Sequence, residues 1–563
     1  MRTKILLIFF VFSFLFRSDH SFDQDLGRHI KLGEIITQTG NVPRTNLFSY
    51  TNPDFPFINT HWLFEVIAYW FNQTIGIQYF LLIKIILFLT SVWLILKIIP
   101  KESSTLLLPV SFIFFHVLRE RLELRPEIFS FLFTALTLFI LTKFLEQKLR
   151  WILLLPFIQL IWINTHIYFF IGLLIQAIYI IHIGYQHLRL QTGFAKLNLL
   201  TIIFVLSVLV SLLNPNGLSG FLYPLNVTKN YGYTIVENQT MFLLESINFR
   251  NSNFLFVKLS IGIIFLSLLI SLVRRKFEIK NILFSLLGMT LALMNVRSFP
   301  YLVFLALPAT LGNLNFIKPN LGTQSLSLIF SVLLLAESYF YLNGDYYRFR
   351  DDYHQVGPKL VESGKGALDF LLGNNLPSPI YNNFDIGSYI INRGYPKYKV
   401  FVDGRPEGYP AKFFQEVYIP SQGDYSKFKE LEKKWAFKTM IFSHTDQTPW
   451  GKAFVQSVVK DPAWELVYID DFMMVLVTND VAKEKKLMRV DLSKLSAISY
   501  SFSNHRSYLN LGLFLLNTQN IYSGKQFIEK ALQIFPNSPV GNSIMASLTG
   551  QTAYVGIQNN FFW

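Results

Sequence analysis

Long apolar runs separated by short polar loops dominate residues 1–342 of the chain. A helix needs about 20 mostly apolar residues to cross a membrane, and runs approaching that length recur here. The pattern predicts a polytopic α-helical membrane protein with about eleven transmembrane helices, in residues 5–16, 77–99, 105–117, 128–144, 152–163, 167–183, 197–213, 254–273, 279–296, 301–314 and 326–342. Several runs are shorter than a full crossing, so the division between neighbouring pairs stays open.

Basic residues fall on alternate loops between these runs. By the positive-inside rule those loops face the cytoplasm; they carry Arg2 and Lys4, Lys97 and Lys101, Lys143, Lys148 and Arg150, Arg189 and Lys196, Arg274, Arg275, Lys276 and Lys280, and Lys318. The N-terminus is then expected inside and the chain after residue 342 outside. The first run also resembles a signal peptide, but the bulky, charged residues 17–20 offer no cleavage site. A retained span is favoured, and cleavage of residues 1–17 stays open.

A more polar pattern follows the last apolar run. Strand-like stretches at 379–382, 399–403, 439–443, 465–469 and 473–478, with helical patterns between several of them, predict an α/β unit. Residues 505–540 fit one tetratricopeptide-like repeat, which cannot bury its apolar face alone and should pack on the α/β unit or on a protein partner. The expected organisation is a transmembrane module at 1–344 with a first outer loop at 18–76, an extracytoplasmic α/β domain at 345–482, and a helical segment at 495–563.

Composition supports a membrane protein and excludes other classes. The chain is 52% hydrophobic with a mean hydropathy of +0.36, too apolar for a soluble protein of 563 residues. Cysteine is absent, which rules out disulfides and thiolate metal sites. The net charge of +14 lies mostly among the apolar runs, where topology explains it, and no basic stripe interleaves with aromatics on the polar domain. We therefore expect no nucleic-acid partner.

Two aspartates, Asp23 and Asp25, follow directly on the first apolar run. Carboxylates at the mouth of a helical bundle are costly to desolvate, so such positions tend to be functional. Asp25 opens a predicted amphipathic helix at 26–39, and a second one follows at 61–71, both expected at the membrane interface. The alternative is that both acids only cap the first of these helices, where negative charge is favourable.

The outer loop 118–127 carries three arginines on the side where they should be scarce: Arg119, Arg121 and Arg125. It is either a salt-bridged helix end, with Glu and Arg at helical spacing, or an anion site. The sequence leaves both open.

Three further polar residues are expected on or near the outer side. Lys84 lies inside the second apolar run and should extend outward, near enough to help hold a phosphate. Arg297 and His166 lie in outer loops, where an interface anchor and a hydrogen-bonded bundle histidine are the usual roles. Their convergence with the acids on one face suggests a site.

Short motifs in a particular order give the chain a family resemblance. They lie at 23–25, 40–43, 48–51, 61–65, 124–127, 162–166, 214–217 and Arg297, and in the polar domain at 383–389 and 402–405. In order and sidedness they resemble membrane-embedded glycosyltransferases of the GT-C superfamily, which includes dolichyl-phosphate-mannose protein mannosyltransferases and bacterial lipid-A glycosyltransferases. The resemblance implies a glycosyltransferase of the bacterial cytoplasmic membrane. It would move a sugar from a polyprenyl-phosphate-linked donor to a hydroxyl of a glycan, lipid or protein acceptor on the extracytoplasmic face, with inversion.

The same resemblance implies roles for individual residues. Asp25 is the expected general base, with Asp23 as a partner that positions the acceptor or holds a divalent cation, Mg²⁺ or Mn²⁺, if one is used. The donor phosphate is expected on Arg121, Arg125, Arg297 and Lys84. Acceptor binding or positioning is expected of Glu65, His166, Asp385 and Arg405.

Two other functions remain open. An O-antigen ligase or polymerase also places arginine and histidine outside, but such enzymes usually concentrate the site in one large late loop, whereas here the acids come first. A non-catalytic membrane scaffold would present the C-terminal repeat to partners, and Asp23 and Asp25 would then be dispensable.

Overall fold

The computed structural model describes residues 2–21, 23, 25–146, 149–191, 193–227, 231–498 and 500–550, so Lys148 of the predicted cytoplasmic loops lies outside the described residues. The chain divides into two compact units. The first unit consists of Met1–Arg17, Ile58–Asn226 and Thr234–Asn343, and the second of Ser18–Phe57, Val227–Tyr233 and Gly344–Trp563.

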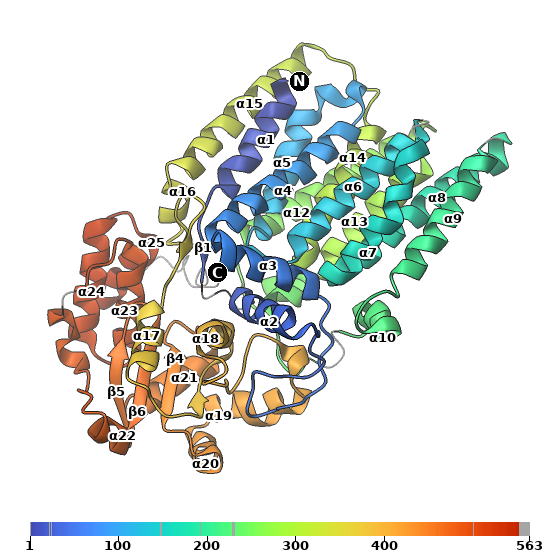
Figure 1. Cartoon of the computed structure of the whole chain (residues 1–563). Helices are drawn as coiled ribbons and strands as arrows, with labels where there is room; N and C mark the ends of the chain where they lie inside the picture. The colour runs from blue at the N-terminus through green and yellow to red at the C-terminus, as the bar shows by residue number, and fades with distance from the viewer. Residues whose placement is uncertain are drawn as a thin grey trace. The chain divides into compact units, whose positions relative to one another are not determined.

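The first unit is a bundle of helices (Figure 1). Every apolar run of the sequence contains a helix; in order these are α1 (Arg2–Leu15), α4 (Ile77–Ile98), α5 (Leu107–Val117), α6 (Glu127–Leu145), α7 (Leu154–Thr165), α8 (Phe170–Leu190), α9 (Phe194–Val210), α12 (Ser252–Val273), α13 (Ile279–Met294), α14 (Phe299–Asn313) and α15 (Leu321–Leu342). Within the described residues, 5 helical stretches are long and apolar enough to cross a membrane, namely α4, α6, α8 with its preceding turn, α12 and α15. A count of about eleven crossings stays a prediction.

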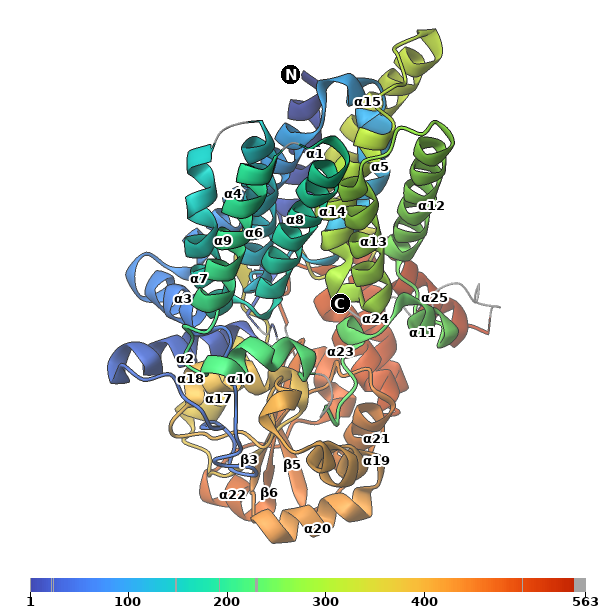
Figure 2. The ribbon, with the colours of Figure 1, turned by 90° about the vertical axis from the view of Figure 1, so that its right-hand side faces the viewer.

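Helix α14 is enclosed by its neighbours, and nearly all of its residues are buried. Both views show α13 beside α14 (Figures 1 and 2), and a Cβ on Gly288 of α13 would lie 3.3 Å from the Cβ of Ala306 on α14. Phe131 of α6 stacks on Phe304 of α14 with ring centroids 5.5 Å apart. In contrast, α12 and α15 expose large apolar side chains such as Phe265 and Leu328, which suits a surface in contact with lipid.

The second unit contains a four-stranded sheet of order β3-β4-β6-β5. Its strands are β3 (Ile380–Tyr381), β4 (Thr439–Ser443), β5 (Trp464–Ile469) and β6 (Met473–Thr478). β3 and β4 are parallel, and β6 is antiparallel to both β4 and β5. Four of the predicted strands are confirmed, and β4 and β6 have the predicted bounds.

The predicted strand at 399–403 is wrong. Val400 forms only an isolated bridge with Ser49, and no ladder continues from it within the described residues. The side chain of Asn382 takes the place of a neighbouring strand: its Oδ1 accepts from the backbone N–H of Phe401 at 2.9 Å and its Nδ2 donates to the carbonyl of Val402 at 2.8 Å. These two bonds and the single bridge at Val400 take the place of a continuous β ladder.

Helices surround this sheet and continue beyond it. They are α16 (Asp345–Arg348), α17 (Lys365–Gly373), α18 (Gly387–Gly394), α19 (Ile419–Gly423), α20 (Tyr425–Trp435), α21 (Pro449–Val458), α22 (Asn479–Glu484), α23 (His505–Asn517), α24 (Ile521–Ile534) and α25 (Pro539–Leu548). Leu511, Phe514 and Phe527 of α23 and α24 lie in one hydrophobic core with Phe454 and Trp464 of the α/β part. The expected packing of this helical pair on the α/β unit is confirmed. Its assignment as a tetratricopeptide-like repeat stays a prediction, and residues 499 and 551–563 of the segment lie outside the described residues.

The first outer loop differs from the expected organisation. The sequence grouped residues 18–76 with the transmembrane module, but residues 18–57, including α2 (Leu26–Thr39), belong to the second unit, whereas α3 (Trp62–Thr74) belongs to the first. A two-residue strand β1 (Asp19–His20) pairs with β2 (Leu360–Val361), and Tyr50 Oη donates to the carbonyl of Ile380 at 2.8 Å. These long-range backbone contacts leave no sign in local sequence patterns.

Gly27 is needed for this docking. A Cβ at Gly27 would lie 2.5 Å from the carbonyl oxygen of Ser388 in α18, closer than real Cβ contacts allow. The next residue, Arg28, donates its backbone N–H to Ser388 Oγ at 2.8 Å. The first turn of α2 therefore lies directly against α18.

Candidate functional site

Three consecutive charged residues, Arg119, Glu120 and Arg121, come shortly after α5, and the first two share a partner that the third lacks. Arg119 donates to Tyr341 Oη at 2.7 Å and to Asn253 Oδ1 at 3.0 Å, and Glu120 accepts from Asn253 Nδ2 at 2.6 Å. These bonds tie the end of α5 to α12 and α15. Arg121 pairs instead with Glu127, six residues further along the same loop, and with the distant Glu237, and neither pair is at helical spacing.

Three arginines meet around one carboxylate in the first unit. Arg121 Nη1 lies 2.5 Å from Glu237 Oε1, Arg125 Nη1 lies 3.2 Å from the same oxygen, and Arg297 Nη2 lies 3.0 Å from Glu237 Oε2. Glu127, the first residue of α6, also pairs with Arg121. We call Arg121, Arg125, Arg297, Glu127 and Glu237 the arginine cluster. Its three guanidiniums and two carboxylates leave positive charge in excess.

The arginine cluster is buried but not fully satisfied. The side chains of Arg121 and Glu237 are 3% and 13% exposed. Arg121 Nη2 and Arg297 Nε are buried with no hydrogen-bond partner among the described residues. Such groups are costly to leave unpaired, which makes them candidates for contact with a bound anion.

Glu237 is ionised in this setting. Burial alone would raise the pKa of Glu237, but the guanidiniums of Arg121, Arg125 and Arg297 outweigh burial and hold that pKa well below its ordinary value. The carboxylate is therefore a permanent part of the cluster at neutral pH.

His166 lies in the turn between α7 and α8. Its Nδ1 is 2.7 Å from Ser130 Oγ, which also accepts from Trp162 Nε1 at 2.6 Å. Burial, followed by the charges of His61 and Arg297, lowers the pKa of His166 well below its ordinary value. The imidazole is neutral and hydrogen-bonded, as a bundle histidine usually is.

Two more candidates lie inside the first unit. Glu65, in the first turn of α3, is fully buried and its Oε2 accepts from Asn59 Nδ2 at 2.6 Å. Lys84 is 1% exposed on α4. Their roles in acceptor and donor binding stay predictions.

The two aspartates lie at the start of α2 in the second unit. Asp23 Oδ1 accepts from the backbone N–H of Asp25 at 2.9 Å and of Leu26 at 3.1 Å, so Asp23 makes capping contacts. Asp25 is the N-cap residue, but its side chain makes no capping bond; its Oδ1 pairs with Arg28 Nη2 at 2.8 Å. The capping alternative therefore describes the contacts of Asp23 better than those of Asp25.

A third acid lies near this pair. Burial raises the pKa of Glu407, an effect that the positive charge of Arg28 opposes and the negative charge of Asp25 reinforces. No group of three or more His, Asp or Glu residues suited to a metal ion occurs among the described residues. The possible cation at Asp23 and Asp25 stays a prediction.

Arg405 lies in the interior of the second unit. Its Nε donates to Asp403 Oδ1 at 2.7 Å, and its Nη2 donates to Asp403 Oδ2 at 2.7 Å and to Asn46 Oδ1 at 2.8 Å. The guanidinium carbon also lies 4.9 Å from the ring centroid of Phe57. This arrangement ties the first outer loop to the α/β part, and an acceptor role for Arg405 stays a prediction.

Asp385 lies in a 3₁₀ turn, η8 (Phe384–Ile386), beside aromatic side chains. Tyr233 stacks on Phe384 with centroids 4.4 Å apart, and Tyr418 Oη accepts from the backbone N–H of Phe384 at 2.7 Å.

The candidate residues belong to two different units. The first unit contains Arg121, Arg125, Arg297 and His166, and the second contains Asp23, Asp25, Asp385 and Arg405.

Sequence reasoning did not identify Glu127 and Glu237 as the counter-ions of the cluster. Both are acids on outer segments of a chain with excess basic charge, which was the available signal. Nothing in the local pattern distinguishes them from Glu245, which forms an exposed pair with Lys258.

No family model matches the chain, and no curated protein matches it. Among solved structures, the chain is similar to the archaeal oligosaccharyltransferase AglB from Archaeoglobus fulgidus, in complex with an inhibitory peptide and a dolichol-phosphate. The TM-score is 0.51 at 10% sequence identity, over 94% of this chain and 85% of that chain. At this identity the likeness shows a shared fold alone.

Proposed function

We propose that the chain is an integral-membrane glycosyltransferase that uses a lipid-linked sugar donor, and that the arginine cluster binds the donor phosphate. The observation that carries this proposal is the pair of buried, unpartnered donors, Arg121 Nη2 and Arg297 Nε, in a cluster with excess positive charge. A phosphate would accept both hydrogen bonds and neutralise the excess charge. The fold shared with AglB, which was solved with a dolichol-phosphate, supports a lipid-linked donor.

The reaction needs a base and a stabilised leaving group. When the sugar leaves its carrier, negative charge grows on the departing phosphate, and guanidiniums placed in advance lower that barrier. The acceptor becomes a competent nucleophile as a carboxylate takes its proton in the transition state. Asp25 is our candidate base, and Arg28, its ion-pair partner, holds its carboxylate in place. Direct displacement with one base inverts the anomeric carbon.

The acceptor has two candidate classes. The family resemblance favours a hydroxyl of a glycan, lipid or protein. The likeness to an oligosaccharyltransferase bound to an inhibitory peptide favours a peptide side chain as the second candidate. The transfer assay should therefore test hydroxyl acceptors and peptide acceptors separately.

Orientation is part of the proposal, because a lipid-linked donor is needed where nucleotide sugars are absent. We place the second unit outside the cytoplasm, with the N-terminus inside. Reporter fusions after Lys196 and Lys280 are expected to report cytoplasm, and fusions after Leu342 the outside. A cytoplasmic result for Leu342 would contradict the placement.

The experiment that tests the chemistry is Asp25→Asn in the purified full-length chain. Asn keeps the shape of the side chain but cannot accept the proton, so transfer from a polyprenyl-phosphate sugar is expected to fall about 10²- to 10⁴-fold. Donor binding should remain near wild type, and thermal unfolding should change little, since the amide oxygen of Asn can still accept from Arg28. Glu34→Gln, on the same helix and paired with Lys31, is the matched control and should keep its activity.

Wild-type turnover by a folded Asp25→Asn protein would exclude Asp25 as the base and move the assignment to Asp23. Full activity of Asp25→Asn and of the corresponding Asp23→Asn protein would favour a non-catalytic scaffold or another class of glycan enzyme.

A further inference from the structure

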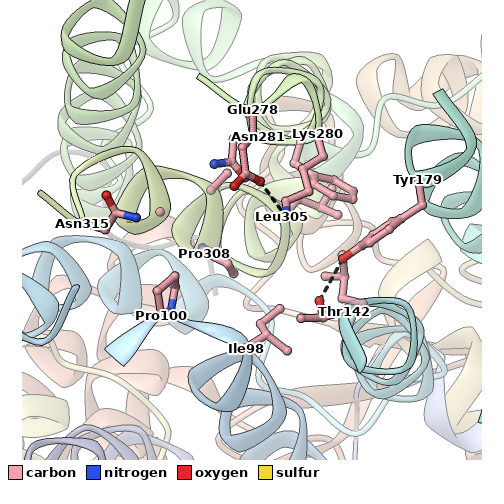
Figure 3. A pocket seen from close by; sticks show the side chains of 14 residues that line it. Ile98, Pro100, Thr142, Tyr179, Glu278, Lys280, Asn281, Leu305, Pro308 and Asn315 are labelled. Carbon is pink, nitrogen blue, oxygen red and sulfur yellow. Dashed lines mark hydrogen bonds and ion pairs between the residues drawn. The ribbon is translucent and has the colours of Figure 1, made fainter. Parts of the chain in front are cut away.

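A cavity of about 110 Å³ lies in the first unit between α4, α6, α8, α13 and α14 (Figure 3). Its lining includes Thr142 of α6, Tyr179 of α8 and Phe284 of α13, together with Glu278 and Lys280 where α13 begins. None of these residues belongs to the arginine cluster or to the proposed transfer site.

The cavity lies toward the other end of the bundle from the arginine cluster. Helix α6 begins at Glu127, a member of that cluster, and reaches the cavity at Thr142. Fifteen residues of α-helix rise by about 22 Å, whereas the hydrocarbon core of a bilayer is about 30 Å thick. The loops around the cavity carry Lys101, Arg274, Arg275 and Lys276, and the sequence predicts that they face the cytoplasm.

The mouth of the cavity carries one charge of each sign. Glu278 Oε2 lies 2.7 Å from Lys280 Nζ, and their side chains are 54% and 24% exposed. Glu278 is the N-cap residue of α13 but its side chain makes no capping bond. The N-terminus of α13 therefore adds positive potential beside the ammonium of Lys280.

The walls combine apolar and polar groups. Leu138, Phe284 and Leu305 supply apolar surface, while Tyr179 Oη and Thr142 Oγ1 bond each other at 2.8 Å (Figure 3). Next to the mouth, Phe277 is 40% exposed. A polar mouth flanked by exposed apolar side chains suits a lipid better than a fully soluble ligand.

We propose that this cavity binds the headgroup of a zwitterionic phospholipid that carries a primary ammonium group. The phosphate lies against Lys280 and the start of α13, and the ammonium lies against the carboxylate of Glu278. Such a headgroup exchanges the Glu278–Lys280 pair for two ion pairs of its own without changing the net charge of the site. A purely anionic headgroup would leave Glu278 facing an anion, and a purely cationic one would leave Lys280 unpaired.

The test uses the purified full-length chain in detergent and native mass spectrometry. Three probes are titrated separately: short-chain phosphatidylethanolamine, short-chain phosphatidylglycerol and free O-phosphoethanolamine. Wild-type protein is expected to bind the ethanolamine lipid at least about tenfold more tightly than the glycerol lipid, the effect of one charge-assisted hydrogen bond. It is also expected to bind the ethanolamine lipid more tightly than free O-phosphoethanolamine, because the free headgroup has no acyl chains to bury against the exposed apolar side chains.

Two variants separate the charges. Lys280→Gln is expected to weaken both lipids about tenfold, while Glu278→Gln is expected to remove the preference for ethanolamine over glycerol. Both side chains are partly exposed, so both proteins should fold, which thermal unfolding checks. Lys276→Gln, exposed in the same loop and absent from the lining, is the matched control and should bind as wild type does.

Equal binding of both lipids by wild-type protein would overturn the zwitterion assignment. Free O-phosphoethanolamine that binds as tightly as the lipid would identify a soluble ligand instead. Unchanged binding in both variants would exclude this cavity as the site. Each readout is independent of sugar transfer and of the proposed function.

Discussion

Both units of this protein bury arginines against acids, but they satisfy them differently. In the second unit, Arg405 makes three side-chain hydrogen bonds to Asp403 and Asn46, and none of its nitrogens is buried without a partner. In the first unit, Arg121 and Arg297 share the carboxylate of Glu237, and each keeps one buried nitrogen without a partner among the described residues.

The difference separates two uses of the same side chain. In the closed pair of Arg405 and Asp403, Nε and Nη2 of the guanidinium are bonded to Asp403 and Asn46, which ties residues 18–57 to the α/β part. An open cluster holds unpaired donors and surplus charge, which cost stability unless a ligand completes them. The arginines of both sites are buried, so burial does not distinguish the closed pair from the open cluster. The two sites differ in whether buried guanidinium nitrogens lack a hydrogen-bond partner.

The largest expected effect is at the closed pair. Arg405→Met leaves Asp403 buried without its ion-pair partner, which is expected to cost about 3–5 kcal/mol of unfolding free energy. Denaturant unfolding of the full chain measures it. Asp403→Leu added to Arg405→Met should recover much of the loss, and Arg393→Met, which breaks an exposed pair with Asp369, should change stability little. A small loss of unfolding free energy in Arg405→Met would contradict the structural role that we assign to the Arg405–Asp403 pair.

A smaller effect is expected at the open cluster, in binding rather than stability. Arg297→Met removes one unpartnered donor while Glu237 keeps Arg121 and Arg125. Affinity for a polyprenyl-phosphate analogue should fall about tenfold to hundredfold, the loss of one charge-assisted hydrogen bond. Exposed Lys318, replaced by Met, is the control. Unchanged affinity with clearly lowered stability would make Arg297 another structural arginine.

The next change acts in the opposite direction. Glu237→Gln keeps the size of the side chain and removes one of the two negative charges of the cluster. Binding of the same phosphate analogue is expected to tighten about tenfold, while the unbound protein becomes less stable. Weaker binding would show that Glu237 acts chiefly by holding the arginines in position.

The smallest effect is a pH dependence. The pKa of Glu237 lies well below its ordinary value of 4.5, so its ionised form stabilises the fold above the unfolded pKa and that contribution is lost as pH falls through the lowered folded value. The stability difference between wild type and Glu237→Gln should therefore be constant from about pH 8 to about pH 5 and shrink below about pH 4. A difference that shrinks between about pH 7 and pH 5 would contradict the lowered pKa.

The secondary structure was largely predictable because its signals are local. Apolar runs placed the bundle helices, and apolar, β-branched stretches placed β4 and β6 with their observed bounds. The failure at 399–403 has the same origin. That stretch has the pattern of a strand, but Asn382 bonds the N–H of Phe401 and the carbonyl of Val402, and Val400 forms only a single bridge to Ser49.

The candidate site was predictable as a set of residue types. Arginines on a loop predicted to face outward were recognisable because that position is unusual for them, and the aspartates because they follow the first apolar run. Which acids would neutralise which arginines was not recognisable, because ion pairs between residues 121 and 237 leave no periodicity. The same holds for residues 18–57, whose membership of the second unit rests on contacts with Ile380 and Ser388.

The pattern of apolar residues is enough to specify a helical membrane bundle followed by an α/β domain, since each helix or strand depends on neighbours a few positions away. Three-dimensional packing specifies the rest. Arg119 and Glu120 both bind Asn253 of α12, yet Arg121, the next residue in the chain, binds Glu127 and Glu237 instead. Closed pairs and open clusters differ only in such long-range contacts, because the cost of an unpaired buried donor depends on what the fold brings within about 3 Å of it.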